Sequence, residues 1–324
     1  MGNFVEFEIL KALIAKKPDI ARFELLEEVE FKGEKYPIYG LVMGPEDPKV
    51  PTFGLFAGVH GLERVGSQLV LSYIESLFEQ LAWDKDLQRK FEDSRFVSIP
   101  IINPVGIAMG TRSNGNGVDL MRNSPVDAGS TAAFLVGGHR MGKWLPWYRG
   151  EVEAEMQKES KALCDFVARH MFPSQFSMSV DVHSGFGIRD RLWYPYARSK
   201  EIFPCLREVE KFKSLVDHTR PHHVYMIEAQ SLNYTTHGDL WDYIFDLHCE
   251  DSKLKGDTRF FVPWTLEMGS WLWVRKNPIQ LFSSLGAFNP IKEHRFRRVM
   301  RRHKPLLELF FSAVRNHEEW LKKY

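Results

Sequence analysis

Residues 53–63 read FGLFAGVHGLE. A run of mostly apolar residues ends here in His60, and Glu63 follows three positions later. Residues 64–81 then show the apolar periodicity of an amphipathic helix. A buried strand that leads through a tight turn into a helix is typical of α/β proteins, whose mostly parallel sheets are covered by helices. The segment therefore predicts a sheet strand whose carboxyl end carries an imidazole and a carboxylate.

The same alternation of strand and helix continues in both directions along the chain. Upstream, a short helix is expected at residues 5–16, and residues 23–43 have the pattern of two strands joined at Lys32-Gly33-Glu34. The expected downstream elements are strands at residues 96–102, 176–182 and 260–269, a helix at 151–171, and C-terminal helices at 290–324. We therefore predict a single α/β domain over residues 1–324, with a central mixed, mostly parallel β-sheet flanked by helices.

The composition narrows the function classes. With 324 residues, 44% of them apolar and 26% charged, the chain lies near the globular average, which excludes collagen-like, coiled-coil and wholly disordered proteins. A formal net charge of +1 gives no global field for nucleic acid, and no run approaches the roughly 18 apolar residues of a membrane span. Neither a nucleic acid nor a membrane is expected as a partner. The widely spaced Cys164, Cys205 and Cys249 favour reduced thiols and a cytoplasmic location.

The imidazole and the carboxylate of residues 60–63 could both bind one cation. His60 and Glu63 lie three residues apart on one expected turn, so both side chains can reach the same point. Taken alone this signal is weak, because one H-x-x-E is expected by chance in such a chain. A loop histidine and a glutamate favoured by the helix dipole are the ordinary alternative.

A second strand end supplies another histidine. Residues 179–185 read SVDVHSG, so a buried strand again ends in a histidine, His183. In an α/β sheet, ligands collect outside the carboxyl ends of the strands, which would bring His60 and His183 to the same crevice. Two histidines and Glu63 make three protein ligands, the number that a catalytic zinc needs if its fourth position is to stay open. We expect one zinc per chain.

The strand expected at residues 260–269 carries a single carboxylate near its end. Glu267 follows the apolar run FFVPWTL, and a glutamate there is costly unless it is solvated, paired or catalytic. Beside a zinc-bound water it would act as general base and then pass the proton to a leaving amine. A solvated strand-end carboxylate is the alternative.

The long glycine-rich segment at residues 103–150 contains two arginines that suit anion recognition. Loops of this length in a compact domain are usually functional. A guanidinium can polarise a scissile carbonyl or hold a carboxylate bidentately, which are the roles considered for Arg112 and Arg122. Asp119 could orient a ligating histidine. Surface arginines in a local salt bridge are the ordinary alternative.

The order H-x-x-E, N-P-x-G, R, G-V-D-x-x-R-N, D-x-H-S and L-E-x-G over residues 36–270 resembles the zinc carboxypeptidase family of the carboxypeptidase A type, including its succinylglutamate desuccinylase and aspartoacylase branch. The resemblance implies a phosphorylase/hydrolase-like fold and amide hydrolysis through a zinc-bound water. It implies the following roles: His60, Glu63 and His183 as zinc ligands, Glu267 as general base, Arg112 at the oxyanion, Arg122 on the substrate carboxylate, and Asp119 as support for the first histidine.

This chain departs from the family pattern at two positions. Met121 stands where the family usually has an asparagine beside the second arginine, which removes an amide donor from the carboxylate-binding pair. Gly185 stands where carboxypeptidases often have an aromatic residue, which opens the site. The resemblance places the family's mobile tyrosine near Tyr234, and it places Asp239 near the bottom of the specificity pocket, where a carboxylate would favour a basic substrate side chain.

Three functions remain open at this point. The first is a metallocarboxypeptidase-like hydrolase acting on peptides. The second is an N-acyl amino acid deacylase of the desuccinylase and aspartoacylase type, which the Met121 departure favours. The third is a catalytically silent protein that binds zinc or a ligand.

A basic segment lies near the C-terminus. Residues 295–304 carry six arginines and lysines, which are interpreted as the solvated face of a helix, with a polyanion-binding patch as the alternative.

Overall fold

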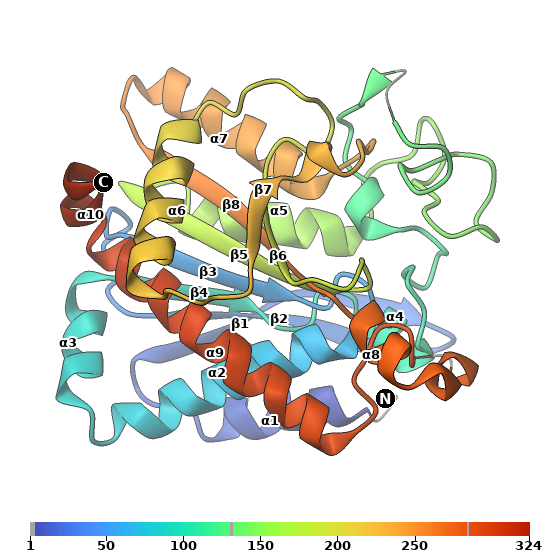
Figure 1. Ribbon diagram of the computed structural model, residues 1–324, viewed down its shortest axis with the longest axis horizontal. Helices are drawn as coiled ribbons and strands as arrows, with labels where there is room; N and C mark the ends of the chain where they lie inside the picture. The colour runs from blue at the N-terminus through green and yellow to red at the C-terminus, as the bar shows by residue number, and fades with distance from the viewer. Residues whose placement is uncertain (1–3, 130–131, 284) are drawn as a thin grey trace.

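The protein folds around one eight-stranded sheet with helices on both faces (Figure 1). The computed structural model describes residues 4–129, 132–283 and 285–324. The strands are β1 (Ala21–Phe31), β2 (Glu34–Met43), β3 (Thr52–Ala57), β4 (Arg95–Ile99), β5 (Phe176–Ser184), β6 (Arg191–Tyr194), β7 (Met226–Ala229) and β8 (Phe260–Met268). The helices of six or more residues are α1 (Val5–Ala15), α2 (Arg64–Leu81), α3 (Lys85–Asp93), α4 (Pro104–Met109), α5 (Lys158–His170), α6 (Leu206–Thr219), α7 (Leu240–Lys255), α8 (Trp271–Lys276), α9 (Glu293–Arg315) and α10 (His317–Lys323).

The sheet is mixed and has a parallel centre. Its strand order is β1-β2-β4-β3-β5-β8-β6-β7. Strands β4, β3, β5 and β8 run parallel to one another, the hairpin β1–β2 joins β4 antiparallel, and the parallel pair β6–β7 joins β8 antiparallel. The expected α/β fold with a mostly parallel sheet is therefore confirmed.

The apolar run at residues 53–59 is explained by burial on both faces of the sheet. Every residue of β3 is buried. Phe53 packs against Phe310 of α9, whereas Phe56 packs against Phe166 of α5 and Trp241 of α7. An offset of three residues reverses the side-chain direction in a strand, so α9 and the pair α5–α7 cover opposite faces. Figure 1 shows α9 crossing in front of the strands and α5 lying behind them.

One expected boundary was wrong. The helix predicted at residues 151–171 begins only at Lys158, because the preceding segment is held in an irregular path by side-chain contacts. Gln157 has extended backbone geometry, and its N–H donates to the Asn123 side chain at 2.6 Å.

The described ranges contain no helix that is both long and apolar enough to cross a membrane.

Candidate metal centre and active-site cavity

The turn at residues 58–63 places the first two side chains of the site. Strand β3 ends at Ala57, α2 begins at Arg64, and the turn between them packs directly on α4. A Cβ atom on Gly61 would lie only 1.9 Å from the carbonyl carbon of Gly106. Glycine is therefore required at position 61, and the close approach of the two backbones fixes where His60 and Glu63 emerge.

Three buried side chains converge at the carboxyl ends of β3 and β5. His60 Nδ1 lies 2.8 Å from Glu63 Oε1, His183 Nδ1 lies 3.2 Å from Glu63 Oε2, and the two Nδ1 atoms are 3.3 Å apart. The ligand atoms of this trio all lie within 4.8 Å of one another. It is the one group of three or more potential metal ligands within the described ranges. Two imidazoles and a carboxylate are a donor set that zinc accepts.

Each histidine is oriented by a carboxylate behind it. His60 Nε2 lies 3.2 Å from Asp119 Oδ1, and His183 Nε2 lies 2.8 Å from Asp181 Oδ2. A proton on Nε2 in each ring would donate to the aspartate and leave the Nδ1 lone pair directed at the shared point. The arrangement therefore fits a metal bound by Nδ1 of both histidines.

Asp181 is a candidate site residue that the sequence does not single out, although it stands in the quoted motif SVDVHSG. The signal was available, because residues two apart on a strand share a face, so a carboxylate at position 181 meets the imidazole at position 183. Its Oδ2 atom also accepts a hydrogen bond from the Trp241 indole at 2.8 Å. That contact ties the orientation of His183 to α7.

The partly buried Arg112 pairs with the fully buried Asp119 beside the His60-Glu63-His183 group. Arg112 Nε donates to Asp119 Oδ2 at 2.7 Å, and Arg112 Nη1 lies 3.5 Å from Glu63 Oε1. Burial by itself would raise the pKa of Asp119, but the Arg112 guanidinium and His60 hold that pKa well below its usual value. Asp119 is therefore ionised and able to accept a hydrogen bond from the Nε2–H group of His60.

Glu267 is brought to the site by strand register. In the parallel ladder between β5 and β8, Glu267 is the partner of His183. The N–H of Phe186 donates to Glu267 Oε1 at 3.0 Å, which fixes one carboxylate oxygen. Burial, together with the neighbouring Glu63 carboxylate, raises the pKa of Glu267 to about 8. A carboxyl group shifted in this direction suits proton transfer near neutral pH.

Arg122 brings a positive charge to the same region. Its guanidinium donates to the backbone carbonyls of Val136 and Met121, at 3.3 and 3.2 Å. No ion pair involving Arg122 occurs in the part of the chain that the structure describes. Arg122 is buried, and Asp119 and Asp239 interact with its charge without forming an ion pair. An anionic group entering the site could therefore pair with it directly.

These side chains surround one cavity of about 590 Å³. Its lining combines the metal ligands with a largely aromatic wall. Tyr234 stands in that wall, with its ring 5.6 Å from Phe186, and burial raises the pKa of its hydroxyl. The lining residues are His60, Leu62, Glu63, Arg112, Met121, Arg122, Val136, Pro146, Trp147, His183, Ser184, Gly185, Phe186, Trp193, Gln230, Tyr234, Thr265, Glu267, Trp271 and Phe288.

Two predicted features of the cavity take a different form in the structure. Gly185 does line the cavity, but Phe288 fills part of the opening, because a Cβ on Gly185 would lie 2.9 Å from its ring. Asp239 is buried outside the lining, and its Oδ1 atom caps α7 by accepting from the N–H groups of Trp241 and Asp242. Contact between Asp239 and a substrate therefore stays a prediction.

Sequence comparisons relate the chain to carboxypeptidases. A family model described as zinc carboxypeptidase matches residues 8–284. The human carboxypeptidase N catalytic chain is 27% identical over 175 residues, which cover 49% of this chain and 35% of that protein. Mouse carboxypeptidase D is 32% identical over 134 residues, which cover 38% of this chain and 10% of that protein. The chain thus spans 35% or less of the length of these two relatives.

The fold is shared with a solved structure of low sequence identity. Bovine thrombin-activatable fibrinolysis inhibitor, in complex with tick carboxypeptidase inhibitor, superposes with a TM-score of 0.67 at 17% identity. The match covers 99% of this chain and 98% of that chain. At this identity the likeness concerns the arrangement of strands and helices alone.

Proposed function

The chain belongs to the zinc carboxypeptidase family, and on that basis we propose that it is a zinc-dependent hydrolase that cleaves an amide bond in a peptide or a small amide. One observation carries the proposal. A buried glutamate, Glu267, lies beside His183 in the β5–β8 ladder, next to a His-Glu-His group whose Nδ1 atoms face one point.

The metal requirement follows from the donor set. His60, Glu63 and His183 would hold one zinc ion, with Asp119 and Asp181 fixing the two imidazoles. A zinc ion in such a site supplies Lewis-acid polarisation of a carbonyl and activation of water. The buried aspartates favour this role because they hold the Nε2 protons and keep both Nδ1 lone pairs available.

The other proposed roles of the side chains are proton transfer, charge stabilisation and substrate binding. Glu267 accepts a proton from the attacking water and delivers it to the leaving amine. Arg112 lies within reach of Glu63 and lines the cavity, so its guanidinium is placed to stabilise negative charge on the carbonyl oxygen. Arg122 and Tyr234 bind the substrate, Arg122 through its unpaired charge on a carboxylate.

The substrate is a peptide or, as the second candidate, an N-acyl amino acid. Both carry a carboxylate that Arg122 can bind. The second candidate is favoured by Met121, which lines the cavity and offers a thioether where the family pattern has an amide donor.

A cytoplasmic location stays a prediction, and it rests on the free Cys164, Cys205 and Cys249.

The metal is tested first, by mass spectrometry of the purified chain and of His60→Ala. We expect about one zinc per chain, lost in the variant. Hydrolysis of a panel of short peptides and N-acyl amino acids by the zinc-loaded chain then separates the two substrates by kcat/KM. A chain without zinc, or zinc that is indifferent to His60→Ala, would contradict the proposed site.

Catalysis is tested by Glu267→Gln. Loss of the proton-transferring carboxylate is expected to lower kcat by about 10² to 10⁴-fold, with the zinc content unchanged. Glu250→Gln, an exposed position on α7, is the matched control and should leave kcat unaltered. Unchanged turnover in Glu267→Gln, or absence of turnover on every substrate with zinc in place, would favour a protein that binds zinc or a ligand without catalysis.

A further inference from the structure

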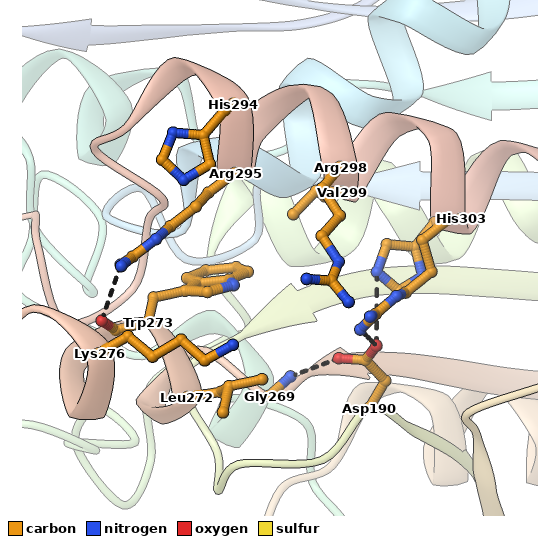
Figure 2. Close-up of a pocket in the computed structure, with 11 residues that line it drawn as sticks. Asp190, Gly269, Leu272, Trp273, Lys276, His294, Arg295, Arg298, Val299 and His303 are labelled. Carbon is orange, nitrogen blue, oxygen red and sulfur yellow. Dashed lines mark hydrogen bonds and ion pairs between the residues drawn. The ribbon is translucent and has the colours of Figure 1, made fainter.

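A second cavity, of about 160 Å³, lies between α8 and the first half of α9 (Figure 2). Helix α8 separates this cavity from the active-site cavity. Trp271 lines the active-site cavity, whereas the second cavity is lined by Leu272, Trp273 and Lys276. The α9 side is contributed by residues 294–303, the basic segment that the sequence left without a function. The cavity is therefore a separate space from the metal centre.

The lining carries a large excess of positive charge. The lining contains four basic side chains, Lys276, Arg295, Arg298 and Arg302, and a single carboxylate, Asp190. That carboxylate already has partners: Asp190 Oδ1 accepts from the Gly269 N–H at 3.0 Å, and Oδ2 accepts from Arg302 Nη1 at 2.7 Å. Of the four cations, only Arg302 has a counter-charge within the cavity.

Two of the cations have no polar partner among the described residues. Arg295 donates to the backbone carbonyl of Trp273 at 3.0 Å, whereas neither Lys276 nor Arg298 forms a hydrogen bond or an ion pair with any described residue. Figure 2 shows the Lys276 amine and the Arg298 guanidinium directed into the space between the two helices, with the Trp273 ring beside them. Both residues are exposed at the mouth of the cavity, so an anion that enters between them can contact both cations.

We infer that this cavity binds a phosphate-class oxyanion, either the free ion or the phosphoryl group of a small molecule. An ammonium and a guanidinium donate several hydrogen bonds to tetrahedral oxygens, and the guanidinium can do so bidentately. The volume holds a phosphoryl group with a small substituent, since one water takes about 30 Å³. A long polyanion is the competing ligand, because Arg297 and Arg301 are exposed on the same helix outside the lining.

The test is isothermal titration of the zinc-loaded chain with inorganic phosphate and with O-phosphoserine, at an ionic strength held constant with chloride. One saturable site is expected. The double variant Lys276→Gln/Arg298→Gln should bind at least tenfold more weakly, whereas Arg301→Gln, an exposed position of the same helix outside the cavity, should bind like the unmodified chain. Circular dichroism melting and zinc content establish that the variants are folded, and Arg298→Lys, which keeps the charge, should retain part of the affinity.

The outcomes separate the sources of the anion and the competing explanations. Tighter binding of O-phosphoserine would identify a phosphorylated small molecule, and equal binding would identify the free ion. Absence of a saturable site, or unchanged binding in the double variant, would overturn the inference, the latter because the anion would then lie at the metal centre. Equal weakening by Arg301→Gln, or tighter binding of a DNA duplex, would replace the cavity with a general polyanion surface.

Discussion

At the scale of single residues, the metal site depends as much on the groups behind the ligands as on the ligands. Asp119 and Asp181 each hold the Nε2 atom of one histidine, and both carboxylates are completely buried. A buried carboxylate is costly unless it is hydrogen-bonded, so the two aspartates gain their stability from the same contacts that orient the rings. The choice of Nδ1 as the ligand atom follows from these contacts.

We predict that Asp181→Asn weakens zinc binding by about 10 to 100-fold, the usual effect of removing a carboxylate that orients a ligating histidine. The neutral amide keeps the volume but no longer stabilises the proton on His183 Nε2. Competition with a chelator of known affinity gives the Kd. Asp246→Asn, which breaks a remote pair with Arg198, is the control, and an unaltered Kd in Asp181→Asn would refute the orienting role.

At the scale of elements, the site is assembled where strands end and helices pack closely. The turn between β3 and α2 lies against the backbone of α4, and Gly61 leaves room for that contact. The β5–β8 ladder then sets Glu267 beside His183. A change in either packing would move His60, Glu63 or Glu267 without altering the side chain itself.

We therefore predict that Gly61→Ala lowers zinc affinity at least tenfold, because the added methyl group overlaps Gly106 and must push the His60 turn away from α4. The control is Gly33→Ala in the β1–β2 hairpin, where a Cβ meets nothing within 4 Å and only the positive φ of +78° opposes the change. That variant should lose some stability, on the order of 1–2 kcal/mol, and no zinc affinity. Equal zinc affinity in both variants would show that the turn is not held by this contact.

A buried histidine on α7 predicts a measurable pH dependence of stability. His248 packs between Phe172 and Phe261, and burial lowers its pKa to about 4. The unfolded chain binds the proton near pH 6.5 and the folded chain does so only near pH 4. The free energy of unfolding should therefore fall by about 3 kcal/mol as the pH drops from 7 to 4 because of this residue.

The measurement is urea unfolding at pH 7 and pH 4 for the unmodified chain and for His248→Phe. Phenylalanine cannot take up a proton, so the variant should lose less stability on acidification. Part of the dependence will remain, because His303 is also buried and its pKa is likewise lowered to about 4. Identical pH dependence in the two proteins would show that His248 is protonated equally in both states.

At the scale of the whole molecule, a bound metal joins parts of the chain that are far apart in sequence. The ligands come from the β3–α2 turn and from the end of β5, more than a hundred residues later. A ligand that binds only the folded state stabilises it by mass action, by about 2.7 kcal/mol at one hundred times its Kd. Zinc should therefore raise the stability of the entire domain.

We predict that removal of zinc by a chelator lowers Tm by about 4 °C relative to the chain at a free zinc concentration of one hundred times Kd. Differential scanning calorimetry with and without chelator measures the shift, and renewed addition of zinc should restore Tm. His60→Ala is the control, since its Tm should respond to neither treatment. An unmodified chain whose Tm ignores the chelator would contradict a metal site built into the folded core.

Local sequence patterns predict the features that neighbouring residues encode. Apolar periodicity indicated the helix at Arg64–Leu81 and the strands that carry the site, and the rule that parallel strand ends meet indicated that His60 and His183 would converge. Long-range packing sets the register that pairs Glu267 with His183, the position of Asp239 outside the cavity, and the space between α8 and α9. These features depend on which distant segments pack together, and local periodicity does not record long-range packing.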